Sequence, residues 1–564
     1  MEVPKHRKLL SLLALSCLIL LLYGPVIGYD FIAVDDGGQV LKNEKIHRLT
    51  PENLMKIFSS ATVSMYQPLT SLLFAVIIAI FGFKTAVGFH ITSILLHILN
   101  SCLVYTVGQR LFKNKVNPLL FASLFAFHPL AVEAVSWVSA TSSLVFTTFF
   151  LAGIIQYDRY LEFGHKKDYR TSILVFFLGC LCKIQMIPFV FVLFLLDFLR
   201  GNQLIQKDKL YLKIPFVLIA LVFTWVTLQF RGEQSGFTGN YNPILLVPIQ
   251  ITWYALKAFF PANLGIVYDW PQTLNVGWIV ASSAVLSALI YLAYKKIKNK
   301  LFVFGLLFYL SNIILHTSLF SSFLGPYADR YGYLSVFGIW ISVFSLFGQK
   351  QMKAVSITGY FLMAIFFITA KQQTTTWEDT IALWSQNLKH QTASFSNGMR
   401  GQLYYEKGMY DAAQRDFEIV ARSPDPRFEP EKYAYLYGAL GKMTTDSDGI
   451  KSAQYFNQAC QYHPSAGNLQ NAGVAYEKIN AFEKAERFYL KCTEISSTPK
   501  CFNSLSSLYF QLERFDDGVA ITAQAIESGF EELIFYKMSC FFLIQTNQIE
   551  SARDHYEKAQ KLYL

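Results

Sequence analysis

Two adjacent carboxylates, Asp35 and Asp36, follow the first long apolar stretch of the chain and are the residues best suited to do chemistry. Neighbouring carboxylates can divide roles, with one of them free to take a proton from an attacking hydroxyl. They can also serve as metal ligands. A plain turn is the third interpretation, because the segment continues into Gly37-Gly38, and Asp-Gly-Gly is a strong turn signal. Spacing alone leaves the three interpretations open.

Other ionisable residues border apolar stretches, where desolvating a charge is expensive unless something uses it. His128 and Glu133 end one such stretch, and this pair predicts either contact with a polar acceptor or a helix cap. Lys183 lies alone between two apolar segments, where an ammonium group calls for an anion. The remaining candidates for substrate binding are Arg231, Asp269, Asp329 and Arg330.

Arg330 is suited to bidentate contact with a phosphate, although the adjacent Asp329 can equally be its partner. The sequence contains no G-x-x-x-x-G-K-[ST] or G-x-S-x-G motif, so neither an ATP-driven mechanism nor a serine hydrolase is supported. No metal-ligating set is assigned, and a requirement for a divalent metal is left open.

The elements that position these residues divide into two parts of different composition. The chain has 564 residues, of which 53% are apolar and 16% charged, against about 25% charged in soluble proteins. Residues 1–370 contain 29 Lys and Arg against 15 Asp and Glu, whereas residues 371–564 contain 20 against 24. This contrast predicts a basic membrane domain over 1–370, a connecting segment over 371–393 and an acidic domain over 394–564.

A helix needs about 20 apolar residues to cross a bilayer, and eleven stretches approach that length. They are 9–27, 86–108, 118–135, 141–158, 172–183, 186–199, 214–230, 276–294, 301–320, 334–348 and 354–370. Two further apolar stretches, 68–83 and 244–260, are assigned as helices at the membrane interface, because only then do the basic clusters share one side. His97 and His316 fall within spans and are interpreted as core or shielded residues.

The same rule orients the chain. It places the N-terminus in the cytoplasm and everything after Ala370 outside, in the periplasm or the lumen of the endoplasmic reticulum, with a bacterial inner membrane favoured. Asp35, Glu133, Lys183 and Arg330 then lie on the outer side.

The C-terminal part repeats a small residue at intervals of about 34, the period of a helix-turn-helix solenoid. These residues are Ala413, Ser452, Ala485, Gly518 and Ala552. An aromatic residue follows four positions later in most of the repeats, and about five repeats are predicted. Such arrays bind peptides or protein surfaces, although this one can also merely brace the membrane domain. The absence of a basic stripe argues against nucleic acid, and a Cys492–Cys501 pair stays a hypothesis.

Several segments together carry a family resemblance. They are Tyr66-Gln67-Pro68-Leu69-Thr70, His128-Pro129 with Glu133-Ala134-Val135-Ser136-Trp137, Ala328-Asp329-Arg330-Tyr331-x-Tyr333-Leu334 and Trp377-x-Asp379, followed by the repeats. The chain resembles the transmembrane and tetratricopeptide-repeat-containing O-mannosyltransferases and their bacterial relatives. The resemblance implies an all-α protein, with a polytopic GT-C-like membrane domain of about eleven helices followed by a tetratricopeptide solenoid.

The resemblance also implies a reaction: transfer of a sugar from a polyprenyl or dolichyl phosphate to a protein Ser/Thr hydroxyl on the extracytoplasmic face, with inversion at the anomeric carbon. Asp35 or Asp36 would be the catalytic base, Glu133 with His128 would shape the acceptor side, and Lys183 with Arg330 would hold the lipid phosphate. The repeats would engage the acceptor protein.

One segment departs from the family. Ser139-Ala140-Thr141-Ser142-Ser143 stands where the relatives carry Gly-Arg/Lys-x-Asp, which removes a charged pair near the cavity. Two alternatives therefore stay beside the protein glycosyltransferase: transfer to a lipid or polysaccharide acceptor, and a non-catalytic membrane scaffold whose repeats recruit envelope or export proteins.

Overall fold

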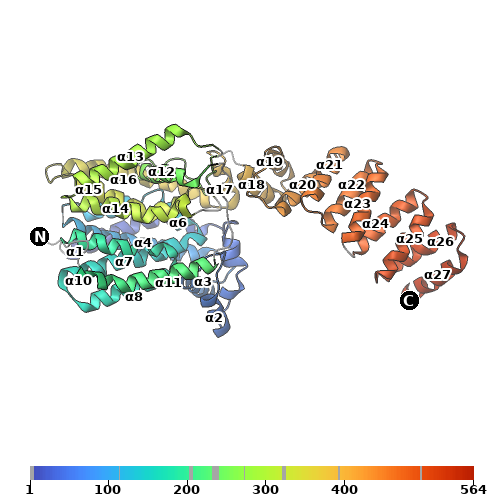
Figure 1. The fold of residues 1–564 in the computed structure, drawn as a ribbon, viewed down its shortest axis with the longest axis horizontal. Coiled ribbons are helices and arrows are strands. Elements are labelled where there is room, and N and C mark those ends of the chain that lie inside the picture. Colours follow the sequence, from blue (N-terminus) through green and yellow to red (C-terminus); the bar gives the residue numbers. More distant parts are fainter. Residues whose placement is uncertain are drawn as a thin grey trace. The chain divides into compact units, whose positions relative to one another are not determined.

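The computed structural model describes residues 5–113, 115–201, 207–230, 241–271, 273–320, 325–390, 394–495 and 498–563. Within these ranges all regular secondary structure is helical, as the sequence predicts. The chain forms two compact units, Met1–Thr392 and Ala393–Leu564. Each unit consists of its own set of packed helices (Figure 1).

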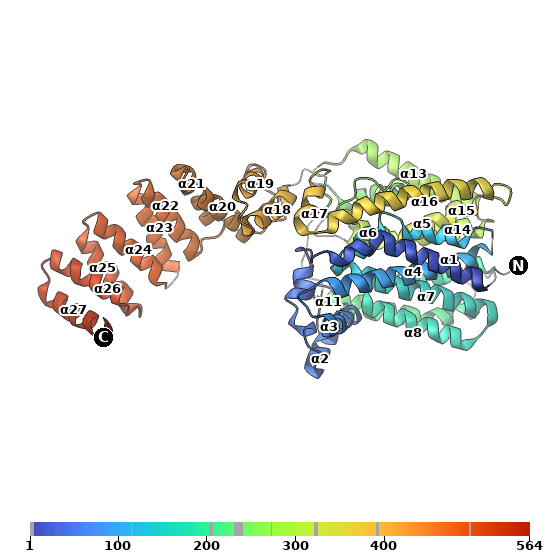
Figure 2. The ribbon, with the colours of Figure 1, turned by 180° about the vertical axis from the view of Figure 1, so that it is seen from behind.

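The first unit is a bundle of helices that run side by side (Figures 1 and 2). Its first half contains α1 (Lys5–Tyr23), α2 (Pro51–Ser59), α3 (Pro68–Phe81), α4 (Val87–Phe112), α5 (Pro118–Ala126), α6 (Ala131–Ser136), α7 (Thr141–Phe163), α8 (Lys166–Cys182) and α9 (Phe189–Leu199). Its second half contains α10 (Lys207–Leu210), α11 (Ile214–Phe230), α12 (Val247–Lys257), α13 (Val276–Lys295), α14 (Lys300–Ile313), α15 (Gly332–Ser345), α16 (Met352–Thr374) and α17 (Thr380–Asn387).

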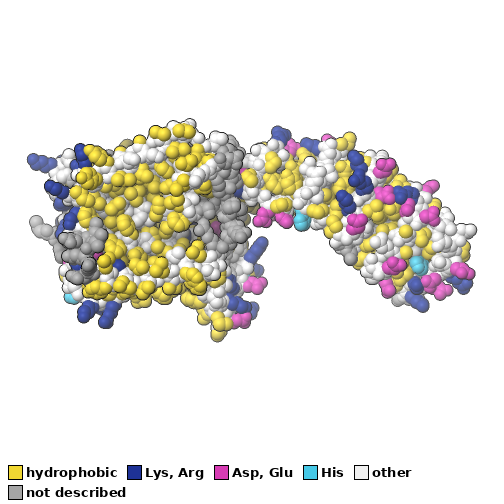
Figure 3. Space-filling model, in the orientation of Figure 1, with side chains coloured by type: hydrophobic (Ala, Val, Ile, Leu, Met, Phe, Trp, Pro, Cys, Tyr) yellow, Lys and Arg dark blue, Asp and Glu magenta, His cyan; other side chains and the backbone are white. Residues whose placement is uncertain are grey.

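Seven helical segments of the described residues are long and apolar enough to cross a membrane. They are His6–Gly28, Val87–Phe112, Val138–Phe163, Tyr211–Phe230, Val276–Lys295, Lys300–Phe320 and Met352–Trp377. Each coincides with one of the eleven predicted spans. Apolar side chains cover the flank of this bundle, and Lys and Arg gather at the end that carries the N-terminus (Figure 3).

The other four predicted spans are shorter helices. The stretch 118–135 is broken between α5 and α6, where Pro129 lacks the N–H that a continuous helix would use. The stretches 172–183 and 186–199 correspond to α8, of 17 residues, and α9, of 11 residues. The stretch 334–348 lies in α15, which has 14 residues. The two stretches assigned to the interface contain the short helices α3 and α12.

Two glycines allow α14 and α15 to pack backbone against backbone. A Cβ atom on Gly305 would lie 2.5 Å from the carbonyl oxygen of Gly338, and a Cβ on Gly338 would lie 2.5 Å from that of Gly305. Any larger residue would force the helices apart. Because α14 leads to His316 and α15 begins just after Arg330, this crossing fixes two walls of the site described below.

An ionic cluster connects several helices at the end of the bundle that carries the N-terminus. Asp158, at 1% exposure, accepts hydrogen bonds from Arg110 at 2.5 Å and from Arg200 at 2.6 Å. Lys213 donates to Asp197 and to the Tyr157 hydroxyl nearby. These buried charges are paired, as burial in an apolar bundle requires, and they join α4, α7, α9 and the start of α11.

The second unit is a row of five antiparallel helix pairs (Figure 1). The pairs are α18 (Ser394–Glu406) with α19 (Tyr410–Arg422), α20 (Pro430–Thr444) with α21 (Gly449–Tyr462), α22 (Ala466–Lys478) with α23 (Phe482–Ile495), α24 (Pro499–Gln511) with α25 (Phe515–Glu527), and α26 (Leu533–Gln545) with α27 (Ile549–Tyr563). The repeated small residues all lie buried in the second helix of a pair.

The repeat pattern has a direct packing reason. A Cβ on Gly473 would lie 2.3 Å from the Tyr489 ring, and a Cβ on Gly401 would lie 2.8 Å from the Phe417 ring. The glycine in the first helix thus makes room for the aromatic ring that the second helix supplies. Cys492 and Cys501 form a disulfide between α23 and α24.

Candidate active site

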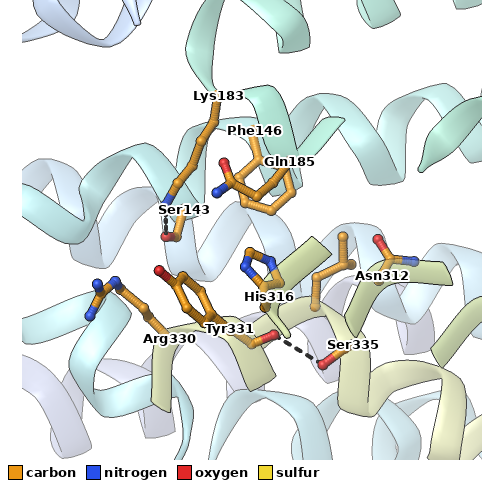
Figure 4. Close-up of a pocket in the computed structure, with 10 residues that line it drawn as sticks. Ser143, Phe146, Lys183, Gln185, Asn312, His316, Arg330, Tyr331 and Ser335 are labelled. Atoms are coloured by element: carbon orange, nitrogen blue, oxygen red, sulfur yellow. Dashed lines mark hydrogen bonds between the residues drawn. The ribbon is translucent and has the colours of Figure 1, made fainter. Parts of the chain in front are cut away.

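A pocket opens at one end of the bundle, and Figure 4 shows the side chains that line it. Its lining residues are Ser143, Phe146, Lys183, Gln185, Asn312, His316, Arg330, Tyr331, Leu334 and Ser335. They come from the start of α7, the turn after α8, the end of α14 and the start of α15. Among these residues, all within the described part of the chain, there is no Asp or Glu. The pocket is therefore suited to an anion.

The position of the pocket follows from helix direction. The α7–α8 hairpin turns at Gly164–His165, beside Arg159, Lys166 and Lys167, whereas Ser143 and Lys183 lie at its other end. Likewise, α14 begins at Lys300 and leads toward His316. The pocket thus lies at the end of the bundle away from these basic residues.

Arg330 is held in place from several directions. Its guanidinium donates to Glu133 Oε1 at 2.5 Å, and its backbone N–H donates to Glu133 Oε2 at 2.6 Å. The guanidinium also lies over the rings of Trp137 and Tyr331, at 5.1 and 5.0 Å. A cation between a carboxylate and two ring faces has little freedom to turn, so its charge is fixed at the pocket.

Lys183 is the second cation of the pocket, and its side chain is almost fully buried at 9% exposure. Its ammonium donates to Ser143 Oγ at 2.8 Å (Figure 4). Lys183 has no carboxylate in contact within the described structure. A hydroxyl partner does not neutralise the ammonium charge, whereas a bound anion would pair with it directly.

The two carboxylates of the loop after α1 have different surroundings. Asp36 is fully buried and accepts hydrogen bonds from the backbone N–H groups of Ile32 at 2.8 Å and Ser139 at 2.9 Å, and from the Ser139 hydroxyl. Burial raises the pKa of Asp36 to about 7 in spite of these donors. Asp36 therefore joins the loop after α1 to the start of α7.

Asp35 is half-buried and interacts electrostatically with Arg330. Burial raises the pKa of its carboxyl above the ordinary value of 3.8, and the positive charge of Arg330 opposes that rise. The structure thus brings Asp35, Glu133, Lys183 and Arg330 to one place, from four segments far apart in sequence.

The remaining candidates have other surroundings. His128 Nδ1 accepts from the Leu130 backbone N–H and Nε2 bonds to the Ala258 carbonyl, so both ring nitrogens have backbone partners. Asp329 accepts from the Tyr268 hydroxyl at 2.7 Å and the Gly265 N–H at 3.1 Å. Burial raises the pKa of Asp329 well above its ordinary value. Asp269 does not line the pocket, and Arg231 lies outside the described residues.

The sequence prediction is wrong for one of the two histidines assigned to spans and right for the other. His316 lines the pocket and stacks on Tyr331 with ring centroids 3.8 Å apart, so its interpretation as a core or shielded residue is wrong. His97 is a core residue as expected, bonded to the Tyr333 hydroxyl at 2.8 Å and the Ala126 carbonyl at 2.9 Å. The signal for Ser139 and Ser143 was the departure from the family pattern at these positions, since their hydroxyls contact Asp36 and Lys183.

Comparison with known proteins gives two family matches. Residues 66–227 match the family described as dolichyl-phosphate-mannose-protein mannosyltransferase, and residues 466–499 match the tetratricopeptide repeat. A solved structure of MamA shares 15% identity with this chain, covering 29% of it and 94% of MamA, with a TM-score of 0.25.

Curated relatives extend the similarity. The protein O-mannosyl-transferase Tmtc2 of Drosophila melanogaster is 26% identical over 48% of this chain and 31% of its own length. The protein O-mannosyl-transferase F38B6.6 of Caenorhabditis elegans is 23% identical over 69% of this chain and 59% of its own. The mouse protein O-mannosyl-transferase TMTC4 is 30% identical over 32% of this chain and 29% of its own.

The chain spans only about a third of the length of the Drosophila relatives. The similarity nevertheless covers both kinds of element seen here, membrane helices and helical repeats. The chain is therefore similar to the dolichyl-phosphate-mannose-protein mannosyltransferase family over residues 66–227 and to the tetratricopeptide repeat over residues 466–499, and it is distantly similar to the protein O-mannosyl-transferases of fly, worm and mouse.

Proposed function

We propose that this protein transfers a sugar from a polyprenyl phosphate to a Ser or Thr hydroxyl of a protein, at the extracytoplasmic membrane surface. The observation that carries the proposal is the pocket in which Lys183 and Arg330 meet without a lining carboxylate, with Asp35 interacting with Arg330 from the outer loop. Two fixed cations suit a phosphate, and a nearby carboxylate suits an attacking hydroxyl.

The chemistry is a displacement at the anomeric carbon. The acceptor oxygen attacks this carbon, its proton passes to the Asp35 carboxylate, and the bond from the carbon to the phosphate oxygen breaks. The polyprenyl phosphate leaves as an anion, stabilised by Lys183 and Arg330. A single displacement inverts the configuration at the anomeric carbon. Asp35 is assigned as the base because the Asp36 carboxylate already accepts three hydrogen bonds from Ile32 and Ser139.

The membrane arrangement follows the sequence prediction. We assign eleven crossings, with α5–α6, α8, α9 and α15 added to the seven longer segments, and place the N-terminus in the cytoplasm. The pocket end of the bundle is then extracytoplasmic. This supports a lipid-linked donor, since such a donor is delivered by the membrane itself. In this arrangement residues 394–564 lie outside, in the periplasm or the lumen of the endoplasmic reticulum, and engage the acceptor protein.

The Cys492–Cys501 disulfide gives a test of this orientation. Disulfides persist in oxidising compartments and are rare in the cytosol, so both thiols are expected to resist a maleimide reagent in denatured membranes until a reductant is added. A variant with both residues changed to Ser is the control for labelling of the other cysteines. Equal labelling before and after reduction would place the repeats in the cytoplasm instead.

The function itself is tested with the full-length protein in detergent or liposomes. Radiolabelled mannosyl polyprenyl phosphate is supplied together with extracytoplasmic proteins from the host, and label is expected in protein that releases it by β-elimination, as an O-linked sugar does. Label in lipid or polysaccharide alone would favour the alternative acceptor class. No transfer, combined with loss of function in cells after deletion of 394–564 but not after substitution of Asp35, would favour the scaffold.

A further inference from the structure

Gln185 carries an acceptor that the pocket leaves unused. Its side-chain oxygen Oε1 is buried and has no hydrogen-bond partner in the described structure. Figure 4 shows the Gln185 side chain lying beside Lys183 in the pocket, on the opposite side from Tyr331 and Ser335. A buried carbonyl oxygen without a donor is unfavourable, so a bound ligand is expected to supply one.

In the described structure the neighbouring groups direct their hydrogen bonds to other acceptors and do not supply that donor. The Lys183 ammonium donates to Ser143, the Asn312 amide donates to the Phe308 carbonyl, and the Ser335 hydroxyl donates to the Tyr331 carbonyl. The Arg330 guanidinium donates to Glu133. A polyprenyl phosphate diester cannot supply it either, because its phosphate oxygens only accept hydrogen bonds at neutral pH.

A hydroxyl on another part of the molecule that carries the phosphate can supply this donor. We infer that Gln185 accepts a hydrogen bond from a hydroxyl of the transferred sugar and so selects which sugar is transferred. This inference rests on the proposed function, since it takes the phosphate to be the one held by Lys183 and Arg330. Gln185 is then a specificity-determining residue beside the phosphate site.

The pocket also limits the class of sugar. None of the lining residues is Asp or Glu, so an amino sugar would find no carboxylate for its ammonium group. The expected substrate is a neutral hexose that presents a hydroxyl next to its phosphate.

The test measures binding, so it does not depend on turnover. The full-length protein is titrated with hexosyl polyprenyl phosphate and with the same polyprenyl phosphate lacking the sugar. Gln185→Met, which has a similar shape but no acceptor oxygen, is expected to bind the hexosyl lipid about tenfold more weakly and the sugar-free lipid unchanged. Gln156→Met is the matched control, a half-buried glutamine on α7 outside the pocket, and is expected to bind both lipids as the wild type does.

Deoxy analogues identify the hydroxyl. For one sugar position, removal of the hydroxyl is expected to weaken binding to the wild type but to have no further effect on Gln185→Met. If Gln185→Met binds the hexosyl lipid normally, or loses both lipids equally, the inference is wrong while the proposed function stands. If the wild type binds neither lipid, both the inference and the proposed function are wrong.

Discussion

Asp35→Asn is expected to lower kcat for sugar transfer by about 10²–10⁴-fold, the range that a positioned general base contributes. Asn has nearly the shape of Asp but cannot take the proton of the acceptor hydroxyl. Because the Asp35 side chain is half-buried and makes no hydrogen bond within the described part of the chain, the thermal unfolding midpoint is expected to stay close to that of the wild type. The measurement is initial transfer rate at saturating donor, with unfolding in the same detergent.

Asp36→Asn is the matched comparison, one residue away with the same change in chemistry. The Ile32 N–H and the Ser139 N–H bond to different oxygens of Asp36, so the amide nitrogen of Asn would face one of these donors, and the attachment of the loop after α1 to the start of α7 is expected to weaken. The expected signature is a lower unfolding midpoint together with a higher KM. Full activity of Asp35→Asn would remove the base assignment, and an activity loss in Asp36→Asn without any loss of stability would transfer the assignment to Asp36.

The pH dependence has a definite sign. A carboxylate acts as a base only when ionised, so the rate falls as pH falls through the pKa of Asp35. Burial holds the pKa of that carboxyl above 3.8. The acid limb of the kcat/KM profile is therefore expected above the pH at which an exposed Asp titrates. Asp36, with a pKa of about 7, takes up its proton near neutral pH.

The sequence was sufficient for the fold wherever periodicity carried the signal. Of the eleven apolar runs predicted to cross the membrane, seven coincide with described helical segments of membrane-spanning length, and the spacing of Ala413, Ser452 and Ala485 predicted the repeats. The sequence was less successful for short helices, because the length of an apolar run gives no indication of a helix break within it, such as the break near Pro129. The stretch 118–135 reads as continuous and apolar, yet α5 and α6 are separate helices.

The candidate site could be predicted only in part from the sequence, for a different reason. Asp35, Lys183 and Arg330 stood out because a charge near an apolar run is costly. Gln185, Asn312 and His316 carry no such signal, because polar residues at helix ends are common and their meeting depends on long-range packing. The partner of Arg330 illustrates the same limit: the adjacent Asp329 was the obvious candidate, whereas the structure pairs Arg330 with Glu133, 197 positions earlier.

Arg330→Met is expected to reduce kcat/KM for the lipid-linked donor by about 10²–10³-fold, the cost of removing one fixed charge-stabilising donor. It also leaves the buried Glu133 carboxylate without its guanidinium, and breaking a buried ion pair costs about 3–5 kcal/mol. Glu133 is only 2% exposed, so a lower unfolding midpoint is expected as well. Loss of activity in this variant alone would therefore not separate catalysis from folding.

The double variant Arg330→Met with Glu133→Gln separates the two effects. A neutral amide at position 133 removes the unpaired buried charge, and its carbonyl oxygen can still accept from the Arg330 backbone N–H, which the substitution keeps. The unfolding midpoint is expected to return toward that of the wild type, while kcat/KM stays low, because the phosphate still lacks its cation. Glu133→Gln alone keeps Arg330 in the pocket and is expected to lose much less activity. If the double variant regained activity along with stability, Arg330 would serve only as the partner of Glu133, and the phosphate would depend on Lys183 alone.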